Sequence, residues 1–151
     1  LRLGTNREPE IYQEGYSFEI GKGVTVKEGR DITLVGQGSI LKDILDAADV
    51  LAEEGIQARV INMHTLKPID KESIRQAMEE TDGILTVEDH NIIGGLGSAV
   101  AEVVAESGQG VPFRRLGLHG FSEGYGSYGQ VKEMNGIGIR NICDAVKRIL
   151  G

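Results

Sequence analysis

Cysteine is nearly absent from this chain of 151 residues, and long apolar runs are absent altogether. The single cysteine, Cys143, excludes an internal disulfide and gives no metal site. No apolar run approaches the roughly 20 residues that a membrane-spanning helix needs, and the N-terminus shows no signal-peptide pattern. We therefore expect a cytoplasmic protein with no membrane partner.

Positive charge is also in short supply. The chain has 16 Lys and Arg residues against 23 Asp and Glu residues, a net charge of -7. This balance disfavours nucleic acid and anionic membranes as partners. The hydrophobic content of 40% and the charged content of 26% are ordinary for a globular domain, and the length fits one domain with an adequate core.

Apolar runs rich in β-branched residues alternate with amphipathic stretches. This alternation predicts a largely parallel sheet that is covered by helices on both faces. The first two strands are separated by a turn that is too short for a parallel crossover, so one of them must run antiparallel. Strands are expected over 23–29, 31–36, 56–62, 82–88 and 111–118. Two helices are expected to begin at Ser39 and Asp70, and two further helices to cover 98–107 and 139–150.

The most informative stretch lies at the end of the expected fourth strand. Its apolar residues stop at Glu88, Asp89 and His90, and the glycine-rich turn 94–97 then opens a helix. In open α/β sheets, ligands and partners dock at the carboxyl ends of the strands. The candidate catalytic residues are therefore His90, Glu88 and Asp89.

His90 is the strongest candidate for proton transfer, because the ordinary pKa of histidine, about 6.5, allows proton exchange at neutral pH. Glu88 and Asp89 could hold its ring or raise its pKa. The alternative, which we favour, is a polar strand end whose hydrogen bonds order the following loop. His64, at the matching place on a neighbouring strand, has the same two interpretations.

The turn Gly94-Gly95-Leu96-Gly97 also has two interpretations. Backbone N–H groups at a helix start can receive an anion, but the spacing matches neither a P-loop nor Gly-x-Gly-x-x-Gly. Glycines also allow the close approach of another backbone. We expect these four residues to contact a neighbouring domain or subunit.

Three blocks carry a specific resemblance: Asp31 to Gly38, Ala58 to Asp70, and Ile84 to Ala101. Each resembles a block of the C-terminal domain of transketolase and related thiamine-diphosphate enzymes, in the same order and at similar spacing. The resemblance covers roughly residues 16 to 118. It implies a three-layer α/β/α fold whose five-stranded mixed sheet has its first strand antiparallel at an edge.

The resemblance also implies a domain organisation. Residues 1–15 resemble a linker that follows a pyrimidine-binding domain, and residues 16–151 would form the transketolase C-terminal-like domain. The chain is then a fragment or the end of a subunit, the alternative being a processed independent protein.

By resemblance, the whole enzyme transfers a two-carbon ketol unit between sugar phosphates of the pentose phosphate type, using thiamine diphosphate and Mg²⁺. The family binds the cofactor through a Gly-Asp-Gly segment, which this chain lacks. We therefore expect the chain alone to bind neither cofactor nor metal and to be inactive. Its expected partners are the pyrimidine- and diphosphate-binding domains, and its expected role is to brace them in a homodimer.

Alternatives remain open within and outside this enzyme class. Deoxyxylulose-phosphate synthase and the β subunit of 2-oxo-acid dehydrogenases share the domain, although Val87-Glu88-Asp89-His90 favours transketolase. The loop from His119 to Gly129 departs from the family pattern, because His119 replaces an acidic residue. The non-enzyme alternative is an independent regulatory module that binds a small anion at the strand ends.

Overall fold

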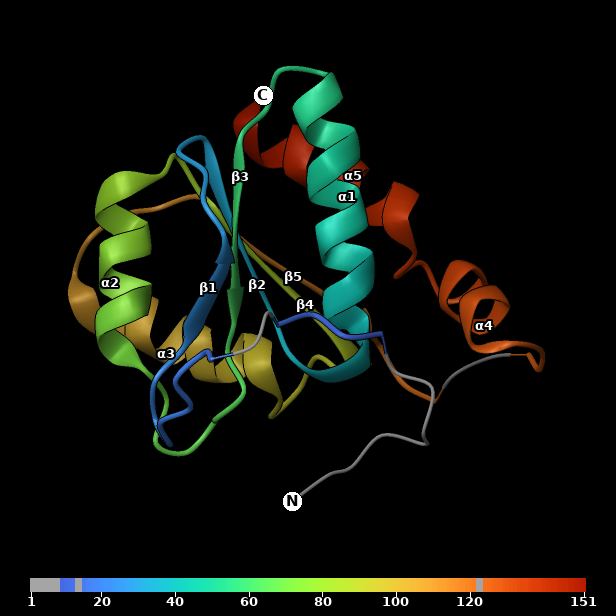
Figure 1. Ribbon diagram of the computed structural model, residues 1–151, viewed down its shortest axis with the longest axis horizontal. Helices are drawn as coiled ribbons and strands as arrows, with labels where there is room; N and C mark the ends of the chain where they lie inside the picture. The colour runs from blue at the N-terminus through green and yellow to red at the C-terminus, as the bar shows by residue number, and fades with distance from the viewer. Residues whose placement is uncertain (1–8, 13–14, 122–123) are drawn as a thin grey trace.

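The computed structural model describes residues 9–12, 15–121 and 124–151. Five strands form one sheet in the order β1-β3-β2-β4-β5 (Figure 1). β1 runs antiparallel to β3, and all other neighbouring pairs are parallel. The strands are β1 (Val24–Lys27), β2 (Ile32–Gly36), β3 (Ala58–Asn62), β4 (Ile84–Asn91) and β5 (Phe113–Leu118).

Four long helices cover the two faces of the sheet. α1 and α5 share one hydrophobic cluster with β2, β3 and β4, and α2 and α3 share a second cluster on the opposite face. Figure 1 shows the two helix layers on either side of the sheet. The helices are α1 (Leu41–Glu53), α2 (Lys71–Glu80), α3 (Leu96–Ser107) and α5 (Ile139–Leu150), with a shorter α4 (Tyr128–Met134) and a 3₁₀ turn η1 (Gly38–Ile40).

This arrangement confirms the predicted three-layer fold with its antiparallel first strand at an edge. β2 lies at the centre, and all five of its residues are buried because both faces of the sheet are covered there. Cys143 is a buried core residue of α5, as expected. No helix in the described part of the chain is long and apolar enough to cross a membrane.

One local prediction was wrong, and one helix was not predicted. Ser39 does not cap the first long helix; it lies inside η1, and Ile40 takes the N-cap position of α1. α4 was missed, because its seven residues lie in a glycine- and tyrosine-rich stretch with no clear apolar period. α4 begins with a capping box in which Ser127 and Gln130 exchange side-chain and backbone hydrogen bonds.

The predicted cap at Asp70 is confirmed. Its carboxylate accepts hydrogen bonds from the backbone N–H and the hydroxyl of Ser73, at 3.2 and 2.7 Å. It also accepts the backbone N–H of Gly23 at 2.9 Å, which ties the chain before β1 to the start of α2. Burial alone would raise the pKa of Asp70, but these hydrogen bonds together hold it below the ordinary value.

We predict that Asp70→Ala lowers the free energy of unfolding by about 1–3 kcal/mol at pH 7, because it removes a cap and leaves the Gly23 N–H without a partner. The pKa of Asp70 is depressed in the folded chain, so its contribution is present above about pH 4 and is lost as the pH falls through the folded pKa. Urea titrations at pH 7 and pH 3 measure both effects.

Asp70→Asn is the matched control. It keeps one oxygen for the Ser73 N–H but loses the second oxygen, which accepts from Gly23 and the Ser73 hydroxyl. We expect a smaller loss than for Asp70→Ala. If the difference in free energy of unfolding between wild type and Asp70→Ala stayed constant from pH 7 to pH 3, this would contradict the role of the carboxylate charge.

Candidate functional site

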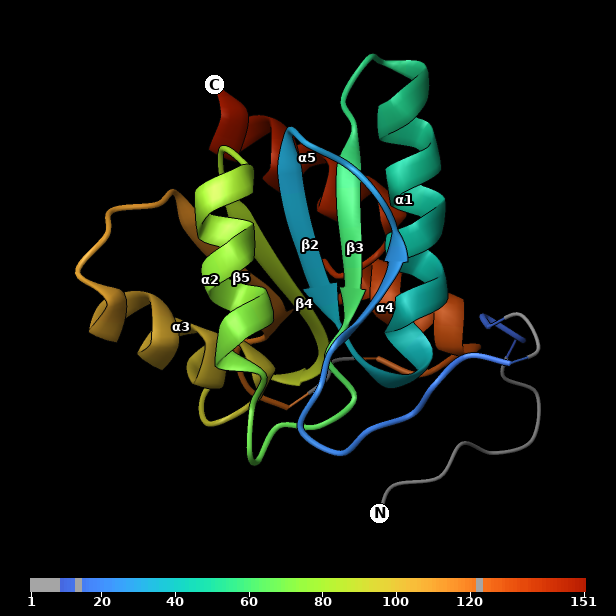
Figure 2. The ribbon, with the colours of Figure 1, turned by 60° about the vertical axis from the view of Figure 1, so that its left-hand side comes forward.

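The candidate site lies at the carboxyl edge of the parallel strands. The chain leaves β2 toward β3 on one side and leaves β4 toward β5 on the other, so the topological switch point falls between β2 and β4. Open α/β sheets bind ligands in the crevice outside such a point. Figure 2 shows the carboxyl ends of β2 and β3 at one edge, with β1 running the opposite way beside them. Glu88, Asp89 and His90 lie at the end of β4, which extends to Asn91.

Glu88 is 1% exposed, yet its carboxylate has well-placed partners. It accepts the backbone N–H groups of Leu96 and Gly97, at 2.9 and 3.0 Å, in the first turn of α3. Helix-start amides lack partners within the helix, and the helix dipole favours a negative group there. Glu88 therefore occupies the place where an external anion would bind.

The same contact explains two of the glycines in the turn. A Cβ on Gly95 would collide with Oε2 of Glu88, and a Cβ on Gly97 would lie 2.8 Å from Oγ1 of Thr86. Glycine is thus required at both positions by this chain's own packing. Leu96 is fully buried in the core. The exposed residues that the turn could present to a partner are therefore Ile93 and Gly94.

The outer part of the turn is organised by its own hydrogen bonds. Oγ of Ser98 accepts from the N–H of Gly94 at 2.9 Å and donates to the carbonyl of Ile92 at 3.0 Å. The guanidinium of Arg115 donates to the same carbonyl at 2.9 Å. Gly94 has a φ of +79°, where glycine is favoured. Ile93 is 79% exposed at the tip.

Asp89 points into a different network. Its carboxylate accepts the hydroxyl of Ser39 at 3.0 Å and that of Tyr128 at 2.8 Å. The two hydroxyls are 2.9 Å apart. Burial, and then the hydrogen bond to Asp89 together with its charge, raise the pKa of Tyr128, which keeps the phenol protonated as a donor. These three residues join β4, η1 and α4.

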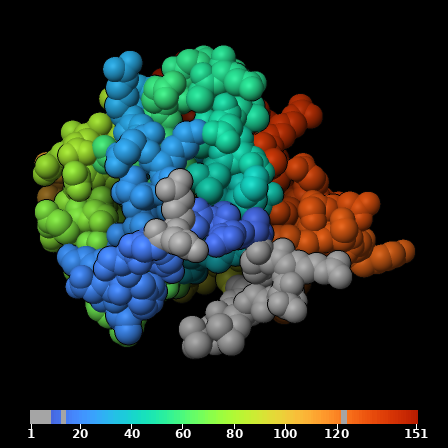
Figure 3. Space-filling model, in the orientation of Figure 1, coloured from blue at the N-terminus to red at the C-terminus, as the bar shows by residue number. Residues whose placement is uncertain are grey.

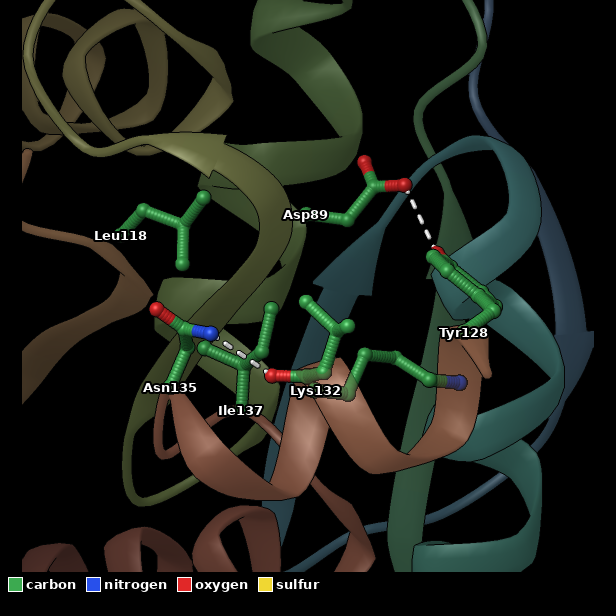
Figure 4. A pocket seen from close by; sticks show the side chains of 7 residues that line it. Asp89, Leu118, Tyr128, Lys132, Asn135 and Ile137 are labelled. Atoms are coloured by element: carbon green, nitrogen blue, oxygen red, sulfur yellow. Dashed lines mark hydrogen bonds between the residues drawn. The ribbon is translucent and has the colours of Figure 1, made fainter. Parts of the chain in front are cut away.

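A hollow of about 130 Å³ lies beneath α4 and beside Asp89 (Figure 4). Its apolar lining comes from Leu118, Val131 and Ile137. On its rim, the ammonium of Lys132 pairs with Asp43 and lies 4.3 Å from the centre of the Tyr128 ring. The hollow is smaller than ligand pockets of about 300 Å³ or more.

The two candidate histidines differ in their surroundings. His90 is exposed at the end of β4. His64 lies on the loop after β3, where its ring packs against Phe18 with 4.5 Å between the ring centroids. Burial lowers the pKa of His64.

The described residues contain no group of three or more His, Cys, Asp or Glu side chains that could hold a metal ion. The contacts of Glu88 and Asp89 join β4 to α3, η1 and α4. Sequence reasoning missed Ser39 and Tyr128, which meet Asp89 only through the fold.

Comparisons with known proteins identify the relatives. A family model described as "Transketolase, C-terminal domain" matches residues 21–142. One of the subunits of the apulose-4-phosphate transketolase of Actinobacillus succinogenes is 38% identical over 147 residues, covering 95% of this chain and 47% of that protein. The 1-deoxy-D-xylulose-5-phosphate synthase of Heliobacterium modesticaldum is 34% identical over 146 residues, covering 97% of this chain and 23% of that protein.

A solved structure is also similar over most of the chain. It is described as a split gene transketolase in an inactive beta4 tetramer, and it is 38% identical with a TM-score of 0.88. The match covers 95% of this chain and 46% of that one. This chain therefore spans about half the length, or less, of the relatives it matches.

We predict that Gly95→Ala destabilises the chain by about 1–3 kcal/mol, because the added methyl group displaces the Glu88 carboxylate. The same change should cost much less in a Glu88→Ala background, where the carboxylate is absent. Thermal and urea unfolding of the four proteins in this cycle should give a coupling energy of about 1 kcal/mol or more.

Gly110→Ala is the matched control, since a Cβ there would meet open space. It should leave stability nearly unchanged in both backgrounds. Equal costs for Gly95→Ala with and without Glu88 would show that the glycine is not required by the carboxylate.

Proposed function

Because this chain belongs to the transketolase C-terminal domain family, we propose that it is the C-terminal domain of a transketolase built from separate subunits. The observation that carries the proposal is the similarity to one subunit of the apulose-4-phosphate transketolase and to a split gene transketolase, each at 38% identity over 95% of the chain. The identity to the deoxyxylulose-phosphate synthase is lower, at 34%.

In this proposal the complete enzyme transfers a two-carbon ketol unit between sugar phosphates of the pentose phosphate type. Thiamine diphosphate and Mg²⁺ supply that chemistry, and both are held by the pyrimidine- and diphosphate-binding domains. Residues 1–15 act as the linker from the pyrimidine-binding domain, and residues 16–151 brace that domain within a cytoplasmic homodimer. The self-association of the split gene relative into a beta4 tetramer supports an assembly role.

The contacts at the carboxyl edge support a bracing role for this domain over a role in the chemical step. Glu88 and Asp89 are both engaged in contacts between elements of the chain. The anion-binding module is disfavoured because Glu88 already accepts the amides of Leu96 and Gly97. The exposed tip formed by Ile93 and Gly94, next to exposed His90, offers the surface for a neighbouring domain.

We predict that the chain alone folds, binds no thiamine diphosphate and shows no ketol transfer. Calorimetric titration with cofactor and Mg²⁺ tests the predicted lack of cofactor binding. One-to-one binding in the micromolar range, about -8 kcal/mol, would contradict it. Adding the matching pyrimidine- and diphosphate-binding parts should restore transfer from a ketose donor. Activity with a 2-oxo acid donor instead would favour the synthase or dehydrogenase alternative.

We predict that Ile93→Glu weakens assembly with those parts while the melting temperature of the isolated chain stays nearly unchanged, because Ile93 is 79% exposed. Val50→Glu, at a 41% exposed position on α1, is the control for adding a surface charge. Sedimentation of the mixture measures assembly. Unchanged assembly with Ile93→Glu would place the turn in solvent.

The same preparation separates a contact role for His90 from a chemical one. His90→Ala should act on assembly or on KM, with single-turnover ketol transfer in the assembled enzyme changed by less than about tenfold. A general acid or base typically contributes about 10²–10⁴-fold. A loss of that size with intact assembly would assign His90 to the chemical step.

A further inference from the structure

The segment 15–22, just before β1, lies along the loop 63–70 between β3 and α2. Two close approaches join them: the rings of Phe18 and His64 lie with their centroids 4.5 Å apart, and a Cβ on Gly21 would lie 3.2 Å from Cγ of Pro68. Just after the segment, the N–H of Gly23 donates to Asp70. Figures 1 and 2 both show the two segments side by side at the carboxyl edge, and Figure 3 shows the blue segment on the molecular surface.

The imidazole of His64 is held in a setting that suits only its neutral form. Its Nδ1 lies 2.9 Å from Oγ1 of Thr65. Its Nε2 is buried and has no hydrogen-bond partner in the described part of the chain. A neutral ring can leave Nε2 as a bare acceptor, whereas a protonated ring carries an N–H at both nitrogens. Burying that second N–H with its positive charge is costly without a partner.

We propose that the Phe18–His64 contact is a pH-sensitive latch, and that protonation of His64 releases the segment 15–22 from the loop 63–70. The latch goes beyond the proposed function and does not depend on it. Because the buried Nε2 has no partner in the described part of the chain, the protonated ring gains most by turning toward water. That movement breaks the ring contact that holds the segment.

Charged groups on the two packed segments do not offset this cost. The segment 15–22 carries Glu19 and Lys22, and the loop carries Lys67 and Asp70. The carboxylate of Asp70 is engaged by Ser73 and Gly23, and burial is the cause of the lowered pKa of His64. Because the folded pKa lies below the ordinary value, the latch contributes fully above about pH 6.5 and is lost as the pH falls through the folded pKa.

Release would change the apolar surface at this edge. Tyr16, Phe18 and Ile20 alternate along the extended segment and are already about half exposed or more. A freed segment would expose them further, while the chain on either side of it stays attached by the Gly23–Asp70 and Tyr12–Asn62 hydrogen bonds. The predicted result is an acid-dependent increase in accessible apolar surface along the segment 15–22.

Hydrogen exchange of residues 15–22 in the full chain tests the latch between pH 7.5 and pH 5, after correction for intrinsic exchange rates. We expect protection in wild type to fall by about tenfold or more, while α1 stays protected. His64→Gln, which cannot ionise in this range, should keep its protection at pH 5. His119→Gln, a change at an exposed histidine, should behave as wild type.

Phe18→Ala keeps the test decisive if His64→Gln is unprotected at every pH. An NMR titration should then give a pKa for His64 below its ordinary value in wild type and closer to that value in Phe18→Ala. Equal pKa values in the two proteins would overturn the proposal. So would unchanged protection of wild type at pH 5, or an equal loss in His64→Gln.

Discussion

A buried carboxylate at the end of β4 is the constraint on which the carboxyl edge of this domain depends. Glu88 reaches the first amides of α3, so that the strand, the turn and the helix are fixed relative to one another. A buried charge of this kind is tolerated only when its oxygens are hydrogen-bonded. Gly95 follows from that requirement, because a side chain there would occupy the space of Glu88, while a side chain at Gly97 would meet Thr86 and Arg115.

The neighbouring residues extend the same principle. Asp89 gathers hydroxyl donors from η1 and α4, and Asp70 joins the start of α2 to the chain before β1. Polar groups at the strand ends thus connect elements that the hydrophobic layers alone would leave free to shift. These hydrogen bonds hold the strand ends and the helix starts of the carboxyl edge in one fixed arrangement.

The sequence predicted the sheet and its layers well, because buried strands and amphipathic helices follow regular periods. The antiparallel edge was predictable from the tight turn between residues 27 and 32, and the cap at Asp70 from its local pattern. The hydrogen-bond network around Asp89 was not predictable from the sequence. Ser39 and Tyr128 lie 50 and 39 positions from Asp89 along the chain and meet it only in the fold. α4 was missed because its anchors are hydrogen bonds and an ion pair rather than an apolar face.

The central claim is that Glu88 caps α3 from within the chain. Amide hydrogen exchange at Leu96 and Gly97 tests it most directly, because first-turn amides of a helix usually lack partners and exchange readily. The account predicts that these two amides are as strongly protected as those of β4. Exchange at nearly unprotected rates, with β4 still protected, would contradict it.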